Sequence, residues 1–226
     1  MAVALAVILL GSISMTAAST QPVREYLSRR QMRTFGEPSQ LLGSDKDLVL
    51  LLVSEHMWRK DNWRCIKSKW VCTETANVSF TRDDHFWIPP HRTSNGTSEK
   101  KPGKLRFQYD VIRKPGEYTK VNTTYITESG NYSYGEYPVH FADDVCMVIA
   151  FPRRASYIFK RPRCALWVVN TTLESPNKYR HCMYILFATC KTPIYNLYEY
   201  EKEDCDSWGE PPEPTYVLAS TEANKC

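Results

Sequence analysis

The chain has 226 residues, of which 42% are hydrophobic, 24% are charged and only 9 are glycine. These proportions exclude a disordered or collagen-like chain and indicate a packed domain of ordinary size. The net charge of +4 comes from 29 basic and 25 acidic residues, an excess too small for salt-driven binding to nucleic acid. We therefore expect no nucleic-acid partner.

The chain begins with an uncharged segment, Met1 to Ala18, in which an apolar run is followed by small and polar residues. This order is typical of a secretory signal peptide that ends at a small-residue cleavage site. No later apolar run approaches the roughly 18 residues that a membrane-spanning helix needs. We therefore predict a secreted, extracellular protein without a membrane span.

The cysteine content agrees with export. There are 8 cysteines, an even number with no C-x-x-C pair, which favours up to four disulfides over a metal site in an oxidising compartment. The chain also carries N-x-S/T sequons, which predict a glycoprotein. The predicted glycosylation sites are Asn77, Asn95, Asn122, Asn131 and Asn170. We expect neither a metal nor a cofactor.

The segments of regular structure change in type along the chain. A short helix is predicted over 23–33, and strands are predicted over 47–55, 65–70, 77–82, 105–111, 120–128, 132–137, 145–151 and 165–170. The polar segment 93–103 is expected to be a loop, and Asp83-Asp84-His85 a charged turn rather than a metal site. A helix follows, with Ser175 as its cap and Pro176 as its first residue. This order indicates an antiparallel barrel or sandwich, and the helix after the last strand favours the barrel, which leaves room inside for one small ligand.

Motifs of catalysis are missing from the sequence. It contains no H-E-x-x-H, no G-x-S-x-G and no glycine-rich phosphate loop, and a cysteine nucleophile would have to be a free thiolate. We therefore predict that the protein is not an enzyme.

Several segments resemble one known family. The run Cys164-Ala165-Leu166-Trp167-Val168, followed by Cys182, Cys190 and the segment 198–205, is similar to the C-terminal signature of tick salivary lipocalins of the histamine-binding group. The segments 47–55, 65–68 and 146–148 resemble strands of the same family. The resemblance implies an all-β fold with flanking helices, an eight-stranded antiparallel lipocalin barrel with a C-terminal α-helix. It also implies a secreted, monomeric protein of tick saliva that sequesters small host mediators at the bite site, without catalysis.

The sequence features and the resemblance together give an organisation, and the resemblance implies a disulfide pattern. A signal peptide over 1–18 and an N-terminal helix and lead-in over 19–46 precede the barrel and its C-terminal helix over 47–205, and a tail over 206–226 follows. The pairings that the family favours are Cys65–Cys205, Cys164–Cys190 and then Cys146–Cys182. Cys72 and Cys226 are left for each other, and no family pattern supports that pair.

The amine-binding pattern of this group is altered at two positions. Met147 stands where an acid follows the cysteine, and Ala165 stands where a glutamate precedes Leu-Trp. A buried cation needs a charge partner, so we predict an apolar or amphipathic lipid, such as an eicosanoid or a sterol, as the ligand. The candidate ligand-binding residues are Phe107, Tyr109, Met147, Ala165 and Trp167.

Three alternatives remain open. The protein could scavenge a biogenic amine, histamine or serotonin, with acids taken from Asp110, Glu117, Glu128, Asp143 and Asp144. It could instead evade immunity by docking to a host immune protein, or its aromatic residues could simply fill a narrow core. The basic stretch 153–163 could bind a lipid carboxylate or a sulfated glycan, and a solvated loop is the plainer interpretation.

Overall fold

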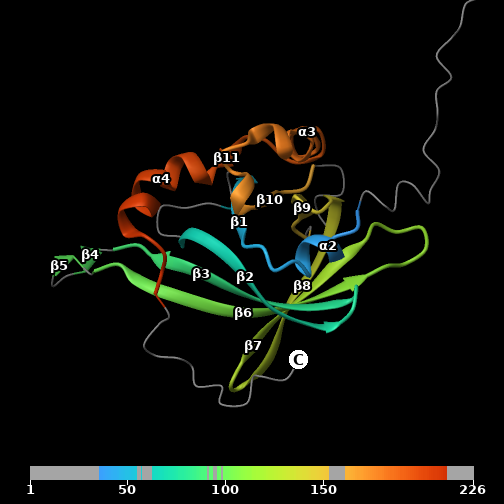
Figure 1. Cartoon of the computed structure of the whole chain (residues 1–226), viewed down its shortest axis with the longest axis horizontal. Helices are drawn as coiled ribbons and strands as arrows, with labels where there is room; N and C mark the ends of the chain where they lie inside the picture. Colours follow the sequence, from blue (N-terminus) through green and yellow to red (C-terminus); the bar gives the residue numbers. More distant parts are fainter. Residues whose placement is uncertain are drawn as a thin grey trace, which may run out of the picture.

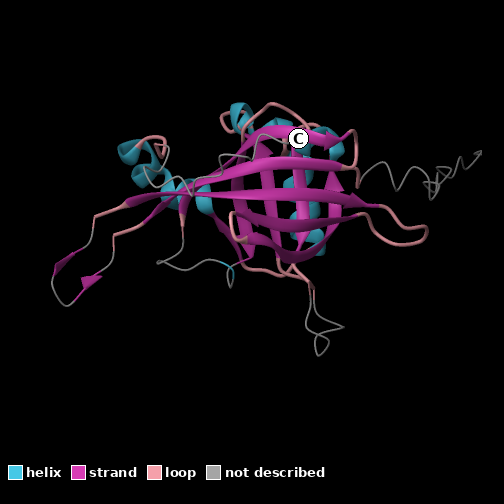
Figure 2. Ribbon diagram, turned by 90° about the horizontal axis from the view of Figure 1, so that it is seen from below, coloured by secondary structure: helices cyan, strands magenta, loops and turns pink. Residues whose placement is uncertain are grey.

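The molecule is built around a sheet that closes on itself (Figures 1 and 2). The computed structural model describes residues 36–54, 57, 63–90, 92–93, 96–97, 99–152 and 161–212. Among these, eight antiparallel strands follow one another in the order β1-β2-β3-β6-β7-β8-β9-β10, and β10 pairs with β1 to complete the ring. This is a lipocalin fold, and the predicted barrel is confirmed. The helix predicted at 23–33 lies outside the described residues.

Most of the barrel strands lie in segments of the sequence where apolar and polar residues alternate. They are β1 Leu48–Ser54, β2 Arg64–Thr75, β3 Ser79–Ile88, β6 Lys101–Ile112, β7 Lys120–Thr127, β8 Gly130–Ala142, β9 Cys146–Ala150 and β10 Cys164–Val169. A separate two-stranded hairpin, β4 Arg92–Thr93 and β5 Gly96–Thr97, projects from the barrel (Figure 2). The expected loop over 93–103 is therefore wrong in part, because it contains this hairpin and the start of β6.

The turn predicted at Asp83-Asp84-His85 is also wrong, because these residues lie in the middle of β3. The three charged or polar side chains are tolerated there because successive residues of a strand point to opposite faces. Asp83 forms ion pairs with Arg106 at 2.7 Å and with Lys104 at 3.1 Å. Asp84 belongs to the opposite face and points into the barrel, so the acidic pair is divided between two environments.

Two helices cover one side of the barrel (Figure 1). Helix α3, Arg180–Thr189, buries Cys182 and Leu186 against β8, β9 and β10. The predicted start of this helix is wrong in part. Ser175 and Pro176 take the cap and first positions of a 3₁₀ turn over Pro176–Lys178, but the Ser175 side chain makes no capping bond, and Tyr179 caps α3 instead.

Helix α4, Leu197–Trp208, begins at Asn196, whose side chain accepts a hydrogen bond from the Glu199 backbone N–H. The short strand β11, Ile194–Asn196, precedes it and pairs with the last residues of β1. Since β1 pairs with β2 only at Leu48 and Val49, β11 and α4 occupy the space where the two strands diverge. No helix in the described part of the chain is long and apolar enough to cross a membrane.

Disulfides attach both helices to the barrel wall. The structure pairs Cys65 with Cys205, Cys146 with Cys182 and Cys164 with Cys190, the three pairings that the family resemblance implies. The first joins β2 to α4, and the other two join β9 and β10 to the two ends of α3. Cys72 on β2 is also disulfide-bonded, and its expected partner, Cys226, lies outside the described residues.

One end of the interior is closed by helix α2, Ser39–Leu42, and the turn after it. Leu41 and Leu42 are buried among inward-facing residues of β3, β6, β7, β8, β9 and β10. Arg82, from β3, is fully buried beneath this segment. Its guanidinium donates to the carbonyls of Leu42, Ser44 and Lys46 at 2.6 to 3.0 Å. These bonds attach the segment that closes this end of the barrel to β3.

The same guanidinium also bonds to β2. It donates to the Ser68 carbonyl at 2.9 Å and to the Ser68 hydroxyl at 3.3 Å. With the three bonds to the 42–46 segment, all five N–H groups of a guanidinium are used. Arg82 therefore donates to four backbone carbonyls, and its bonds to the carbonyls of Leu42 and Ser68 are buried.

We predict that Arg82→Met lowers the free energy of unfolding by about 3 to 5 kcal/mol, because it leaves those buried carbonyls without partners. Urea denaturation followed by circular dichroism measures the change. Arg180, exposed at the start of α3, provides the control, and Arg180→Met should change stability by no more than about 0.5 kcal/mol. Equal effects of the two substitutions would contradict the role assigned to Arg82.

Candidate ligand-binding cavity

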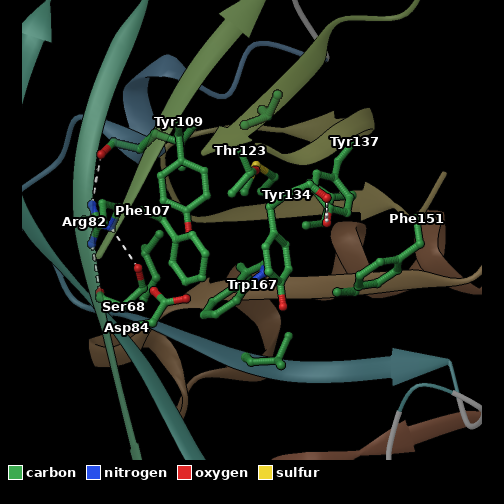
Figure 3. Close-up of a pocket in the computed structure, with 17 residues that line it drawn as sticks. Ser68, Arg82, Asp84, Phe107, Tyr109, Thr123, Tyr134, Tyr137, Phe151 and Trp167 are labelled. Carbon is green, nitrogen blue, oxygen red and sulfur yellow. Dashed lines mark hydrogen bonds between the residues drawn. The ribbon is translucent and has the colours of Figure 1, made fainter. Parts of the chain in front are cut away.

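The barrel contains a cavity of about 140 Å³, shown in Figure 3. Engineered apolar cavities of about 150 Å³ bind one benzene-sized molecule, so this space accommodates a group of roughly one ring. The wall is predominantly aliphatic and aromatic. It is formed by Leu42, Leu48, Leu50, Ser68, Arg82, Asp84, Phe107, Tyr109, Val121, Thr123, Tyr134, Tyr137, Met147, Ile149, Phe151, Ala165 and Trp167.

All five residues chosen from the sequence as ligand-binding candidates line this cavity. Phe107 and Tyr109 are alternate residues of β6, so both point inward. Met147 of β9 lies opposite Trp167 of β10, and Ala165 is two residues before Trp167. The strand period thus brings the five together, and their role in binding remains a prediction.

The acids proposed as substitutes for the missing amine ligands do not line the cavity. Asp110 accepts hydrogen bonds from Ser79 and Gln108. Asp143 bonds to His181 on α3 at 2.7 Å. Glu117, Glu128 and Asp144 are exposed, so none of the five is placed to meet a ligand in the barrel.

The cavity does contain one carboxylate, from Asp84. This side chain comes from β3, opposite Ser68 on β2, and Figure 3 shows Ser68, Arg82 and Asp84 on one side of the cavity and Tyr134, Tyr137 and Phe151 on the other. Asp84 is only 8% exposed. Among the described residues, its Oδ1 atom has no hydrogen-bond partner.

The electrostatics of Asp84 follow from its position. Burial raises the pKa of this carboxyl to about 7, and the hydrogen bond with Ser68 and the charge of Arg82 only partly oppose that rise. Burial also lowers the pKa of Arg82, but an arginine stays protonated in proteins. Near neutral pH the polar side of the cavity therefore carries one fixed positive charge and one carboxyl close to its titration point.

Sequence reasoning missed Asp84, although the signal was present. Phe80, Arg82, Asp84 and Phe86 are alternate residues, and extending the strand predicted at 77–82 by six residues would have placed Asp84 on its inner face. The charged and polar residues at 82–85 interrupt the apolar alternation, so the strand was predicted to end at residue 82.

Aromatic side chains form the opposite part of the wall. Phe107 contacts Tyr125 and Tyr134, with ring centroids 5.6 and 5.5 Å apart. The Tyr137 hydroxyl donates to the Tyr134 carbonyl at 3.2 Å. Tyr134 is 58% exposed, which places this side of the wall next to solvent. The cavity thus has a buried polar side and an aromatic side that reaches the surface.

Other groups of chemical interest lie outside the cavity. Asp143, Cys146, His181 and Cys182 lie close together, but both sulfurs form the disulfide to α3 and are not thiolate ligands. Of the basic stretch, residues 153–160 lie outside the described part of the chain, and Arg161 and Arg163 are exposed.

The predicted glycosylation sites differ in accessibility. Asn77 and Asn131 are exposed, Asn122 and Asn170 are half-buried, and Asn95 lies outside the described residues. Their occupancy remains a prediction.

Comparison with known proteins finds a likeness of fold. No protein-family model matches the chain, and no curated protein matches it. Among solved structures, the chain is similar to Japanin from Rhipicephalus appendiculatus, in a crystal form bound to cholesterol. The match has 12% sequence identity and a TM-score of 0.48, and covers 69% of this chain and 93% of that chain.

We predict that the carboxyl carbon of Asp84 titrates near pH 7 in an NMR experiment and that this signal is lost in Asp84→Asn. The folded state then holds a proton that the unfolded chain releases near 3.8. The stabilisation is complete below that value and is lost as the pH rises through about 7, at about 1.4 kcal/mol per pH unit between the two pKa values. A carboxyl that titrates below pH 5 contradicts the predicted environment.

Proposed function

We propose that the chain is a secreted, non-catalytic lipocalin that binds and sequesters a small, mainly apolar molecule inside its barrel. The observation that supports this most directly is the cavity itself, whose wall is apolar and aromatic apart from a small polar side. Such a wall, with few polar anchors, is typical of sites for small organic ligands. Disulfides form and persist in oxidising compartments, which supports export.

Within this proposal, an amphipathic lipid is the preferred ligand. Met147 and Ala165 present apolar surface where an amine site of this group would place acids. The cavity volume of about 140 Å³ accommodates one ring or a short segment of chain. A longer lipid would extend along the aromatic side past the exposed Tyr134. Its polar end would then lie at the buried side, near Ser68 and Asp84.

A biogenic amine is the second candidate, and a specific observation favours it. Asp84 supplies a buried carboxylate in the cavity wall, and a carboxylate is the natural partner of an ammonium group. The nearby charge of Arg82 reduces this attraction, because it already compensates the carboxylate. The amine therefore ranks below a neutral or weakly polar ligand.

The proposal predicts that filling the cavity abolishes binding. Ala165 lines the cavity and is 2% exposed, so Ala165→Phe places a ring in the space meant for the ligand. Binding of a fatty-acid and sterol panel, followed by the fluorescence of Trp167 and the other tryptophans, should weaken at least about tenfold, which corresponds to about 1.4 kcal/mol of binding free energy.

The matched control is Ala188→Phe, which adds the same ring to an exposed position of α3 and should leave the affinity unchanged. Circular dichroism checks that both variants fold. If no lipid or amine binds the unmodified protein, or if both variants bind like it, ligand sequestration in this cavity is refuted.

A further inference from the structure

We propose that the cavity selects a neutral ligand bearing an alcohol group, which donates its hydrogen bond to the Oδ1 atom of Asp84. The proposal rests on the function proposed above and adds the chemistry of the ligand's polar end. It assigns Asp84 as the residue that distinguishes alcohols from amines, carboxylates and plain hydrocarbons of the same shape.

The geometry of Asp84 supplies the first argument. Its neighbours across the sheet are Ser68 on β2 and Leu105 on β6, and its carboxyl points into the cavity (Figure 3). Oδ1 is buried and has no hydrogen-bond partner within the described segments of the chain. A buried acceptor without a donor lowers stability. A ligand that brings a donor to this point removes that cost, whereas a hydrocarbon leaves it in place.

The charges around the cavity supply the second argument. Of the described residues that line it, only Arg82 and Asp84 carry charge, and their charges cancel when Asp84 is ionised. Asp83, the adjacent acid, pairs with Arg106 and Lys104 on the other face of the sheet. An ammonium ligand would leave this apolar space with a net charge of +1, which is unfavourable at low dielectric. An alcohol leaves the balance unchanged.

A carboxylate ligand is disfavoured for a separate reason. Arg82 is the cation nearest to the polar side, but its five N–H groups are already donated to Ser68 and to backbone carbonyls. It therefore has no donor left for a fatty-acid head group. The same carboxylate would also approach the ionised form of Asp84, which repels it.

The protonation state of Asp84 affects the binding of an alcohol and of an amine differently. An alcohol can donate to ionised Asp84 or accept from protonated Asp84, whereas an ammonium group can only donate. The titratable groups that face Asp84 are Arg82 on its own strand and Tyr109 on β6, and burial raises the pKa of Tyr109 well above its usual value, so both keep their protons near neutral pH. Alcohol affinity should therefore be nearly constant between pH 5 and pH 8, while amine affinity should fall as Asp84 gains its proton.

The test uses four ring-sized probes of one shape: benzyl alcohol, toluene, benzylamine and benzoate. Dissociation constants come from NMR titrations of the full chain and of two variants, Asp84→Leu and Asp84→Asn. We expect Asp84→Leu to reduce the affinity for benzyl alcohol relative to toluene about tenfold, the usual effect of one such hydrogen bond. Asp84→Asn keeps an acceptor and should change this ratio less than about threefold.

A further readout needs no variant. Benzyl alcohol should shift the carboxyl carbon resonance of Asp84, and toluene should not. The proposal is overturned if Asp84→Leu leaves the ratio unchanged, if the Asp84 resonance is insensitive to benzyl alcohol, or if benzylamine or benzoate binds the unmodified protein more tightly than benzyl alcohol. If one of these results overturns the inference, the proposed function still stands provided that toluene binds the unmodified protein and does not bind Ala165→Phe. If no probe binds, this inference fails, and the fatty-acid, sterol and amine titrations described above decide the proposed function separately.

Discussion

The structure depends on a buried guanidinium. Arg82 has no solvent exposure, and its hydrogen bonds connect β3 to β2 and to the segment that closes one end of the barrel. The carbonyls of that segment belong to a turn rather than a sheet, so they need donors from elsewhere. One charged side chain supplies those donors and defines the polar side of the cavity. Its charge also opposes, in part, the rise that burial causes in the pKa of Asp84, because the two side chains are neighbours on the same face.

Much of the fold could be predicted from the sequence, because apolar residues alternate with polar ones along a half-buried strand. That period located the strands, and together with the family resemblance it placed Phe107, Tyr109, Met147, Ala165 and Trp167 on inward faces, where all five now line one cavity. The resemblance also gave the disulfide pairs that the structure contains. These features depend on local patterns and on cysteine positions, which a sequence displays directly.

The polar side of the cavity could not be predicted, because its chemistry depends on pairs of residues distant in sequence. Asp83 and Asp84 look alike in the chain, yet one is neutralised by Arg106 and Lys104 while the other is buried. Arg82 lies 40 residues from Leu42, whose carbonyl it binds. In the sequence alone, a charged residue of a buried strand cannot be told from one in a solvent-exposed turn, because only its tertiary contacts distinguish the two.

The distribution of the cysteines divides the barrel into two mechanically different halves. The chain has no cysteine between Cys72 and Cys146, so β3, β6, β7 and β8 are held by noncovalent interactions alone. In the other half, β2, β9 and β10 are linked by disulfides to two helices, and β1 pairs with both β2 and β10. Asp84 and most of the aromatic wall belong to the half without disulfides. Any widening of the cavity therefore meets the least covalent resistance on the side that carries Asp84, and the half with the disulfides is the more constrained one.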